Sequence, residues 1–541
     1  MARCVYDVFA ATATVAPDAD FLYVESVTAE AYGISPGSIS WREAKAHVEA
    51  LRGIYRAAGY GHGHRVALQL ENRPEFIFHW LALNALGASI VPVGSDVRAA
   101  ELEHLIEHSQ VSLAVTLSSH TQLFADAAVA VGACLVVVEP AIDEGLFAQA
   151  GPAPRAGQTI DSQTECALLY TSGTTGRPKG CILSNDYFIR AGQWYAGLDD
   201  LCEVRPGKER ILTPLPLNHS NALVYSTMVT LTAGGCLIQL DRFHPSTFWQ
   251  SVKESGATIV HYLGILPALL LAKEASTQDR EHQVRWGFGA GVAPEYHADF
   301  ETRFGFPLIE AWAMTETGAG SVVMANHEPR HVGTHCFGKP TSDIEWRLVS
   351  EEGDDVELGQ PGELWVRQSG PDPRKHFFSG YLGDVEATEV AWEGDWFHTG
   401  DVVRADAAGS LYFVDRRKNI IRRSGENISA IEVETEVNSH PAVKLSGITA
   451  VPDQVRGDEV MACVVTNDLV PPEEFPRIAQ SIVEFCLGRL AYYKAPGYIA
   501  FVDRLPLTSS QKIQRGKLRT FAAGLLSDAR CVDTRELKKR R

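Results

Sequence analysis

Hydroxyl, glycine and basic residues are concentrated in one short stretch, residues 170–180. It reads Tyr-Thr-Ser-Gly-Thr-Thr-Gly-Arg-Pro-Lys-Gly and follows the apolar residues 166–169, which have the pattern of a short buried strand. Glycines allow the backbone to curl so that N–H groups point at an anion, and hydroxyls add further donors. Lys179 and Arg177 supply positive charge. The stretch therefore predicts a phosphate-binding loop at the end of a strand.

This loop is not a Walker A motif, because the pattern GxxxxGK[ST] is absent from it. A flexible serine–glycine linker is the structural alternative. Linkers rarely follow an apolar strand and rarely end in Pro-Lys-Gly, so the phosphate-binding interpretation is favoured.

Length and charge limit the classes of function. The chain has 541 residues, 45% of them hydrophobic, and a formal net charge of −18. At roughly 150 residues per domain it is long enough for several domain-sized units. The acidic balance argues against non-specific nucleic-acid binding and against binding to anionic membranes. A phosphate ligand must therefore bind at a local cluster of positive charge.

Cysteine usage and the N-terminus indicate the compartment. The ten cysteines include no CxxC pair, so we expect reduced thiols rather than disulfides or a zinc site. His62 and His64 are better explained as a polar loop than as a metal pair. The N-terminus has no signal-like core, and no apolar run approaches the roughly 18 residues of a membrane span. We expect a cytoplasmic protein without membrane insertion.

The elements that must position the loop alternate between strands and helices. Alternation at a spacing of about 20 residues predicts a parallel sheet with helices on its faces. Residues 344–415 show short alternating runs between turns, which predicts a mostly antiparallel region. Strands are expected at 65–70, 90–93, 112–117 and 134–139, and helices at 74–86, 99–109, 120–131, 185–197, 248–255 and 267–275.

The predicted fold class is therefore α/β. The N-terminal domain, residues 1–415, is expected to contain parallel αβ layers and a β-rich subdomain at about 340–415. Residues 416–541 are expected to form a small α/β C-terminal domain, with a helix at 431–440 and strands at 444–451 and 459–465.

Five further stretches, at 311–316, 396–401, 415–421, 424–429 and 506–519, carry polar groups in a defined order. Their sequences are Ala-Trp-Ala-Met-Thr-Glu, Trp-Phe-His-Thr-Gly-Asp, Asp-Arg-Arg-Lys-Asn-Ile-Ile, Ser-Gly-Glu-Asn-Ile-Ser and Pro-Leu-Thr-Ser-Ser-Gln-Lys-Ile-Gln-Arg-Gly-Lys-Leu-Arg. Together with the phosphate loop they resemble the motifs of the adenylate-forming (ANL) superfamily of acyl-CoA synthetases, adenylation domains and luciferases. The chain looks most like bacterial acyl-CoA synthetases of the carnitine/crotonobetaine-CoA ligase type.

The resemblance implies two half-reactions. A carboxylic acid attacks the α-phosphate of ATP and releases pyrophosphate, and the thiol of coenzyme A then attacks the acyl-adenylate and releases AMP. It also implies Mg²⁺, a mobile C-terminal lid and a hinge near Lys418. Dimers are common in the family, so a homodimer is one expectation for an oligomeric state that the sequence leaves open.

The resemblance also assigns the groups that bind the nucleotide. Glu316 would hold Mg²⁺ jointly with phosphate oxygens, and Thr315 would donate to a phosphate. Asp401 would accept the ribose hydroxyls, Trp312 would stack on the adenine, and Arg416 would reach the ribose or a phosphate. The whole implied nucleotide site is Thr171, Ser172, Gly173, Thr174, Thr175, Gly176, Lys179, Gly289, Ala290, Gly291, Trp312, Thr315, Asp401 and Arg416.

Lid residues and an acyl pocket complete the implied site. Lys512 would bridge the substrate carboxylate and the α-phosphate, and Gly425 would line the tunnel for the pantetheine arm of coenzyme A. His219 matches an acyl-pocket histidine of the family. The implied catalytic residues are Lys512, Thr315, Glu316 and His219, and the implied acyl pocket contains His219, Asn221, Tyr225, Met314 and the strand end at 261–266.

The mixed polarity of the acyl pocket does not define the acid. Overall resemblance, rather than any motif, suggests a terpenoid acid of the platensimycin/platencin kind. The individual roles also have structural alternatives: a helix-start carboxylate for Glu316, a turn residue for Asp401, a core side chain for Trp312 and a solvated lysine for Lys512.

The chain departs from the family pattern around adenylation. Trp312 replaces a tyrosine, Ala313 and Gln511 replace glycines, and Asn419 removes a carboxylate near the hinge. These departures suggest an alternative in which the enzyme only converts a preformed acyl-AMP into an acyl-CoA. A degenerate protein that binds AMP or an adenylate without turnover is a second alternative, and acyl transfer to a separate carrier protein is a third.

Overall fold

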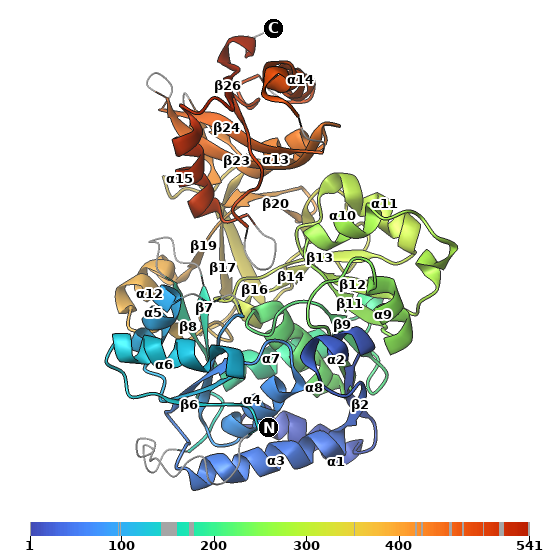
Figure 1. The fold of residues 1–541 in the computed structure, drawn as a ribbon, viewed down its shortest axis with the longest axis vertical. Coiled ribbons are helices and arrows are strands. Elements are labelled where there is room, and N and C mark those ends of the chain that lie inside the picture. The colour runs from blue at the N-terminus through green and yellow to red at the C-terminus, as the bar shows by residue number, and fades with distance from the viewer. Residues whose placement is uncertain are drawn as a thin grey trace.

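The computed structural model describes residues 2–95, 97, 99–141, 159–171, 178–350, 352–416, 419–423, 426–453, 457–467, 470–490, 492–507 and 513–538. These residues form four sheets. Figure 1 shows three of them in a large lower body and the fourth in a smaller C-terminal body above it. No helix among the described residues is long and apolar enough to cross a membrane.

The first sheet contains the strand that leads into the phosphate loop. Five of its strands run parallel, and two antiparallel strands, β8 and β18, extend one edge. The strand order is β18 (Gly380–Tyr381), β8 (Lys179–Ser184), β7 (Glu165–Thr171), β4 (Ser89–Pro92), β3 (Arg65–Gln69), β5 (Leu113–Thr116) and β6 (Val136–Val138), and the connecting helices are α4 (Pro74–Asn84), α5 (Ala99–Ser109) and α6 (Thr121–Ala130). The predicted alternation of strands and helices is confirmed here.

The second sheet has a parallel centre and one antiparallel strand at each edge. Its order is β14 (Val323–Met324), β13 (Leu308–Trp312), β12 (Trp286–Gly289), β11 (Ile259–His261), β9 (Arg210–Thr213), β10 (Cys236–Gln239), β1 (Asp20–Val24) and β2 (Gly37–Ser40). The helices of this region are α1 (Val5–Val15), α2 (Ser26–Tyr32), α3 (Trp41–Ala57), α7 (Asn185–Ala196), α8 (Thr227–Ala233), α9 (Phe248–Ser255), α10 (Ile265–Leu271) and α11 (Pro294–Phe304).

Both boundaries of one helix in this region were predicted wrongly. The expected helix at 267–275 is α10, which begins at Ile265 and ends at Leu271. Pro267 was taken as the start, but a proline is also tolerated further into the first turn, where its missing N–H has no intrahelical partner.

The third sheet confirms the antiparallel region expected from 344 to 415. Its order is β15 (Cys336–Gly338), β20 (Leu411–Arg416), β19 (Phe397–Ala405), β17 (Gly362–Gln368) and β16 (Ile344–Val349), and all of its neighbouring strands pair antiparallel. The exposed helix α12 (Val385–Ala391) lies between β18 and β19 in the chain.

The fourth sheet belongs to the C-terminal part of the chain and has its own buried clusters. It contains β21 (Ile421–Arg423), β22 (Glu426–Ile428), β23 (Val443–Asp453), β24 (Gly457–Thr466), β25 (Tyr498–Phe501) and β26 (Cys531–Asp533), with helices α13 (Ala430–Asn438), α14 (Phe475–Leu487) and α15 (Arg515–Leu525). The chain changes sheet between Arg416 and Ile421. Lys418, the predicted hinge, lies outside the described residues.

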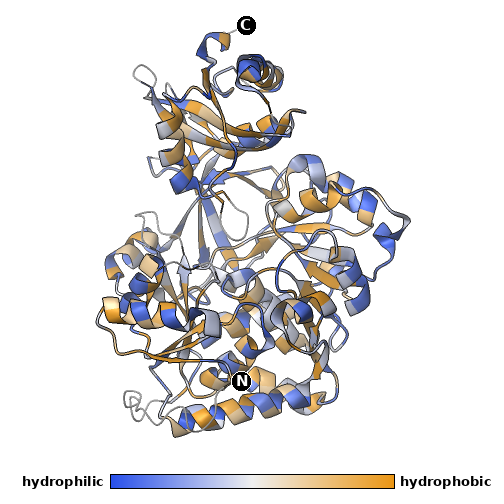
Figure 2. Ribbon diagram, viewed as in Figure 1, coloured by the Kyte–Doolittle hydropathy of each residue, from blue (hydrophilic) through white to orange (hydrophobic). Residues whose placement is uncertain are grey.

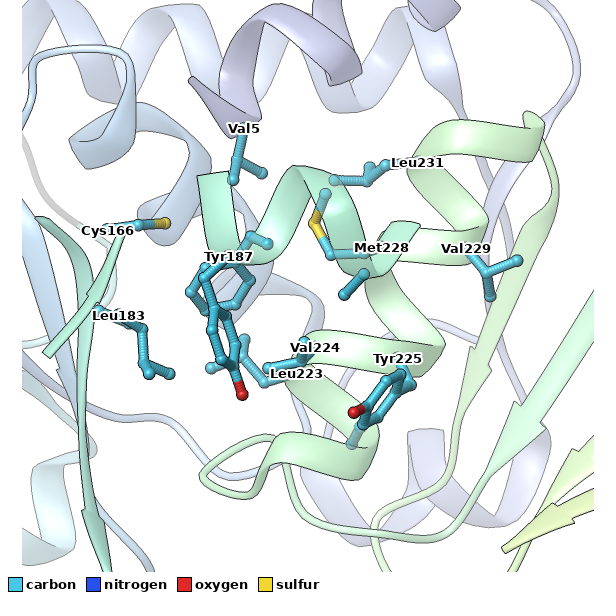
Figure 3. Packing of buried hydrophobic residues seen from close by; sticks show 14 of the residues in the cluster. Val5, Cys166, Leu183, Tyr187, Leu223, Val224, Tyr225, Met228, Val229 and Leu231 are labelled. Atoms are coloured by element: carbon cyan, nitrogen blue, oxygen red, sulfur yellow. The ribbon is translucent and has the colours of Figure 1, made fainter. Parts of the chain in front are cut away.

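A buried cluster joins the first two sheets. Figure 3 shows side chains from α1, β7, β8, α7, α8 and the helix η3 (Asn221–Ser226) in one buried cluster, with Tyr187, Leu223 and Met228 among them. Tyr187 and Met228 are 0% exposed. The long helix α3 closes the bottom of the molecule; hydrophobic and hydrophilic residues alternate along it in Figure 2. Ser40 and Glu43 form its capping box.

Candidate active site

The predicted phosphate loop connects two antiparallel strands. Strand β7 ends at Thr171 and β8 begins at Lys179, and these two residues face each other in the ladder. The start of the loop is thus held close to its basic end. The loop residues Ser172, Gly173, Thr174, Thr175 and Gly176 lie outside the described residues.

Lys179 lies against two residues that the sequence did not single out. Its Nζ is 3.6 Å from Oδ2 of Asp384 and 4.8 Å from the ring centroid of Tyr381. The hydroxyl of Tyr381 donates to Oε1 of Glu316 over 3.0 Å. Tyr381 therefore connects the basic end of the loop to the predicted Mg²⁺ ligand, and burial raises the pKa of its hydroxyl, with the charge of Glu316 adding to the rise.

Thr315 and Glu316 lie in a turn that follows β13. The turn is held by the hydroxyl of Tyr187, which donates to the carbonyl of Thr315 over 2.9 Å, and by the N–H of Phe378, which donates to the carbonyl of Glu316 over 2.9 Å. The side chain of Thr317 accepts from the N–H of Met314 over 2.9 Å. Glu316 is 7% exposed, so the turn presents a buried, fixed carboxylate.

The described residues contain no group of three or more His, Cys, Asp or Glu side chains arranged to hold a metal ion. Mg²⁺ is usually held by one or two carboxylates together with substrate phosphates. The single carboxylate of Glu316, near Lys179 and the predicted phosphate loop, fits that pattern.

Asp401 is the second buried carboxylate of the site. Its side chain is 3% exposed, and it lies in β19, directly paired with Arg416 of β20. Oδ1 of Asp401 is 2.9 Å from Nε of Arg416, and Oδ2 accepts from Nε1 of Trp312 over 2.9 Å. The backbone N–H of Asp401 donates to Oγ1 of Thr399 over 3.0 Å. The structure thus brings three predicted nucleotide residues together around one carboxylate.

The glycine segment after β12 shows a close backbone approach. A Cβ at Gly289 would lie 2.3 Å from the carbonyl oxygen of Tyr262, so a larger residue does not fit. Gly291 has a φ of 78°, the left-handed region that favours glycine. Ala290 is half-buried and Gly291 is exposed, so this backbone remains open on one side. It fits the predicted approach to a planar base.

The side chain of Glu310 fixes the segment around Gly291 through two hydrogen bonds, a role that the sequence did not predict. Its Oε2 accepts from the N–H of Gly291 and its Oε1 from the N–H of Val292, each over 2.8 Å. Burial raises the pKa of the Glu310 carboxyl.

Asn221 and Tyr225 of the predicted acyl pocket lie on the π-helix η3 (Asn221–Ser226), His219 lies two residues before it, and Met314 lies after the end of β13. Such helices are rare and are often found at functional sites. Tyr225 is 5% exposed and packs against Trp194 and Phe288, with ring centroids 5.9 and 5.6 Å apart. Met314 is half-buried and His219 is exposed.

A buried histidine contacts the first and the last residue of this π-helix. Nδ1 of His261 is 2.7 Å from Oδ1 of Asn221 and 2.8 Å from Oγ of Ser226, and Nε2 is 2.9 Å from the hydroxyl of Tyr195. Burial lowers the pKa of His261 to about 3, so the ring is neutral. The sequence marked only the strand end at 261–266, not this role.

The predicted residues of the C-terminal part are described only in part. Lys512, Gln511, Gly425 and Lys418 lie outside the described residues. Nδ2 of Asn419 donates to Oδ1 of Asp415 over 3.3 Å, and Oδ2 of Asp415 accepts from Oγ of Ser429 and the N–H of Ile431, each over 3.0 Å. Asp415 thus joins the end of β20 to the start of α13.

Comparison with known proteins agrees with this geometry. The family described as AMP-binding enzyme matches residues 9–382, and the AMP-binding enzyme C-terminal domain matches residues 432–512. The crotonobetaine/carnitine–CoA ligase of Shigella sonnei is 29% identical over 495 residues, which cover 89% of this chain and 93% of that protein.

Solved structures of CoA synthetases and related enzymes share the fold. The ATP-bound MatB of Rhodopseudomonas palustris has a TM-score of 0.78 at 24% identity, with 96% of this chain and 99% of that chain covered. The o-succinylbenzoate coenzyme A synthetase of Bacillus subtilis, in complex with ATP and magnesium, has a TM-score of 0.76 at 23% identity, with 94% and 98% covered.

None of these three proteins is named for a terpenoid acid, and the prediction of such an acid has no support. The resemblance to adenylate-forming enzymes and the α/β fold class are both confirmed. Because the first family covers well over half of the chain, the protein belongs to the AMP-binding enzymes.

Proposed function

We propose that the protein is an AMP-forming acid–thiol ligase that converts a carboxylic acid to its coenzyme A thioester through an acyl-adenylate. The observation that carries this proposal is the segment from Trp312 to Glu316. At one end Trp312 bonds to the buried carboxylate of Asp401, and at the other end Glu316 bonds to Tyr381, which lies against Lys179. One short segment thus connects the ribose-binding and the phosphate-binding groups.

In the first half-reaction the nucleotide would lie along this segment. Asp401 would accept the ribose hydroxyls, the backbone at Gly289 and Gly291 would meet the adenine, and Thr171 and Lys179 would bind phosphates. Glu316 would hold Mg²⁺ together with phosphate oxygens, and the bound ion would supply charge that compensates the phosphates. Phosphoryl and adenylyl transfer depend mainly on such positioning and charge compensation.

In the second half-reaction the thiol of coenzyme A would displace AMP from the acyl-adenylate. We place the domain boundary between residues 415 and 416, close to the change of sheet, with the hinge near Lys418 and residues 416–541 as the lid. Lys512 would serve the adenylating pose and Gly425 the thioester-forming pose. The name of the Shigella relative, a CoA ligase, supports coenzyme A as the acceptor.

The acyl group would lie beside η3. Asn221, Tyr225 and Met314 offer both polar and apolar contact, and His219 would lie at the exposed end of the helix. The relatives named above act on different acids by their names, so the acid of this enzyme is left to experiment.

The alternative restricted to the second half-reaction stays beside this proposal. Ala313 does not adopt a left-handed backbone, so its methyl group causes no backbone strain in the turn. The alternative concerns the contact of this methyl group with bound phosphates, and pyrophosphate exchange separates it from complete turnover.

The test is a panel of carboxylic acids incubated with ATP, Mg²⁺ and coenzyme A, with AMP and acyl-CoA measured by mass spectrometry. We expect equal amounts of AMP and thioester from at least one acid, and loss of both in Asp401→Ala. Asp355→Ala is the matched control, because Asp355 is an exposed carboxylate of the same subdomain that pairs with Arg347. Tight AMP binding without product from any acid or acyl-AMP would contradict the proposal and indicate a binding protein.

A further inference from the structure

Asn221 is the first residue of the π-helix η3 and the one residue of that helix that is not buried. Its side chain lies at the carboxyl edge of the second sheet, because it contacts His261, the last residue of β11. There His261 pairs with Phe288 of the parallel strand β12, which ends at Gly289. Ligands of open α/β sheets bind outside the carboxyl ends of the strands. The amide of Asn221 therefore lies on the side of the sheet where the proposed adenine segment begins.

The partners of His261 determine which of its ring nitrogens carries the proton. The ring is neutral, so one nitrogen donates and the other accepts. The hydroxyl of Ser226 donates to the carbonyl of Asn221 over 3.2 Å, which leaves it no proton for Nδ1. The hydroxyl of Tyr195 lies 2.9 Å from Nε2 and has no other acceptor in the described part of the chain, so it donates to Nε2. The proton of the ring is therefore on Nδ1.

This proton fixes the orientation of the Asn221 amide. Nδ1 of His261 lies 2.7 Å from Oδ1 of Asn221, and a donor at this place requires the amide oxygen rather than the N–H₂ group. The N–H₂ group is thereby turned away from the histidine. It has no hydrogen-bond partner among the residues that the structure describes, and it is not one of the buried polar groups that lack a partner. Asn221 thus holds an accessible donor in one orientation.

The surroundings of this donor favour one class of ligand group. The rest of η3 is buried, and its Tyr225 packs against Trp194 and Phe288. A hydrocarbon placed against the N–H₂ group would leave the donor unpaired, whereas an oxygen acceptor would pair with it. The amide carries no formal charge, so it compensates an uncharged oxygen better than a second carboxylate.

We propose that Asn221 is a specificity-determining residue whose N–H₂ group donates to an uncharged oxygen acceptor, such as a keto or ether oxygen, in the acyl part of the acid. This inference rests on the proposed function and narrows its substrate class. The sequence predicts Asn221 in the acyl pocket but assigns it no partner.

Stable mimics of the acyl-adenylate test the proposal without turnover. The acylsulfamoyl-adenosines of 2-, 3- and 4-acetylbenzoic acid are compared by calorimetry with those of the corresponding ethylbenzoic acids. The members of each pair have nearly the same shape and differ in a carbonyl group in place of a methylene group. We expect wild type to bind the acetyl member about 10-fold more tightly for at least one ring position. Asn221→Leu keeps the approximate size of the side chain and removes the donor, so it should abolish or reverse that preference.

Ser226→Ala is the matched control. It removes the other group beside Nδ1 of His261 and leaves the amide of Asn221 in place, so the preference for the acetyl member should remain. Asn221→Asp covers the case in which Asn221→Leu fails to fold. It keeps an oxygen for the bond to His261 and replaces the N–H₂ group by an acceptor, so it should also lose the preference.

Three results would overturn the proposal. The first is the absence of a preference in wild type at every ring position, and the second is a preference that survives in either Asn221 variant. The third is equal weakening of both members of a pair in Asn221→Leu, which would assign the donor to the reacting end of the acid. If wild type binds none of the mimics, the proposed function fails; if it binds them without preference, only this inference fails.

Discussion

The hydroxyl of Tyr381 donates to Oε1 of Glu316 over 3.0 Å, and the ring of the same tyrosine lies 4.8 Å from Nζ of Lys179. Tyr381 reaches this position because β18 pairs with β8, which places Tyr381 opposite Cys181. One side chain thus couples the predicted metal ligand to the basic end of the predicted phosphate loop.

Tyr381→Phe tests this coupling. The variant removes the donor to Glu316 and keeps the ring beside Lys179. We expect the Mg²⁺ concentration for half-maximal pyrophosphate exchange to rise about 3- to 10-fold, as for loss of a hydrogen bond to a charged group. Tyr412→Phe removes a similar bond, to Oδ2 of Asp406 over 2.7 Å outside the site, and should have no such effect. An unchanged Mg²⁺ requirement in Tyr381→Phe would refute the coupling.

Gly289→Ala tests the close approach of the backbone after β12. The new methyl group would lie 2.3 Å from the carbonyl oxygen of Tyr262, so the backbone at position 289 or the backbone at Tyr262 must shift. We expect a loss of about 1–3 kcal/mol in stability, together with weaker AMP binding. Gly524→Ala is the control: a Cβ there meets nothing within 4 Å, and alanine in helix α15 should be neutral or stabilising. Normal AMP affinity in Gly289→Ala would show that this backbone does not contact the base.

Asp415→Asn tests how β20 is joined to the C-terminal part. Oδ2 of Asp415 accepts from Oγ of Ser429 and from the N–H of Ile431, so the N–H₂ group of an asparagine at that position would face two donors. In the flipped orientation the N–H₂ group would face the backbone N–H of Arg416 and Nδ2 of Asn419, which are also donors. The mismatch should cost about 1–3 kcal/mol locally. We expect faster hydrogen exchange at the start of α13, with AMP binding retained. Asp406→Asn changes a turn carboxylate of the same sheet and should leave α13 protected.

Acid should destabilise the protein through His261. Burial lowers its pKa from the ordinary 6.5 to about 3, so the folded state binds fewer protons than the unfolded state at intermediate pH. Its contribution to stability is fully present above pH 6.5 and is lost as the pH falls from 6.5 toward 3, by about 1.4 kcal/mol per pH unit.

His261→Gln should therefore be less stable at pH 7 but show a shallower fall of the melting temperature between pH 6.5 and 5. Part of the fall should remain, because burial also lowers the pKa of His79 and of His335 to about 4. His327→Gln changes an exposed histidine and should keep the wild-type slope. A slope unchanged by His261→Gln would show that this histidine does not take up the proton.

Local pattern was sufficient for much of the fold. The helices α5 and α9 were predicted with the observed boundaries, Ala99–Ser109 and Phe248–Ser255, because apolar periodicity and flanking turn residues are local signals. The antiparallel region was also recognised from alternating residues. By contrast, β8 was missed: Lys179 and Gly180 were assigned to the phosphate loop, and only the pairing with β7 on one side and β18 on the other makes residues 179–184 a strand.

The site residues likewise divide into those that local motifs predict and those that only contacts between distant segments reveal. Motifs placed Trp312, Glu316 and Asp401 in one site, and the structure brings Trp312 and Asp401 into contact. Nothing local marked Tyr381, Glu310 or the anchoring role of His261, since each acts through a hydrogen bond to a residue distant in the chain. Trp312 was expected to act through its ring, and only the geometry reveals the use of its N–H.

The measurement that tests the central proposal most directly is exchange of labelled pyrophosphate into ATP. It is run with an acid whose synthetic acyl-adenylate this enzyme converts to a thioester with coenzyme A. We predict exchange that requires both the acid and Mg²⁺ and that is lost in Asp401→Ala. Thioester formation from the acyl-adenylate without any exchange would contradict the account and would restrict the enzyme to the second half-reaction.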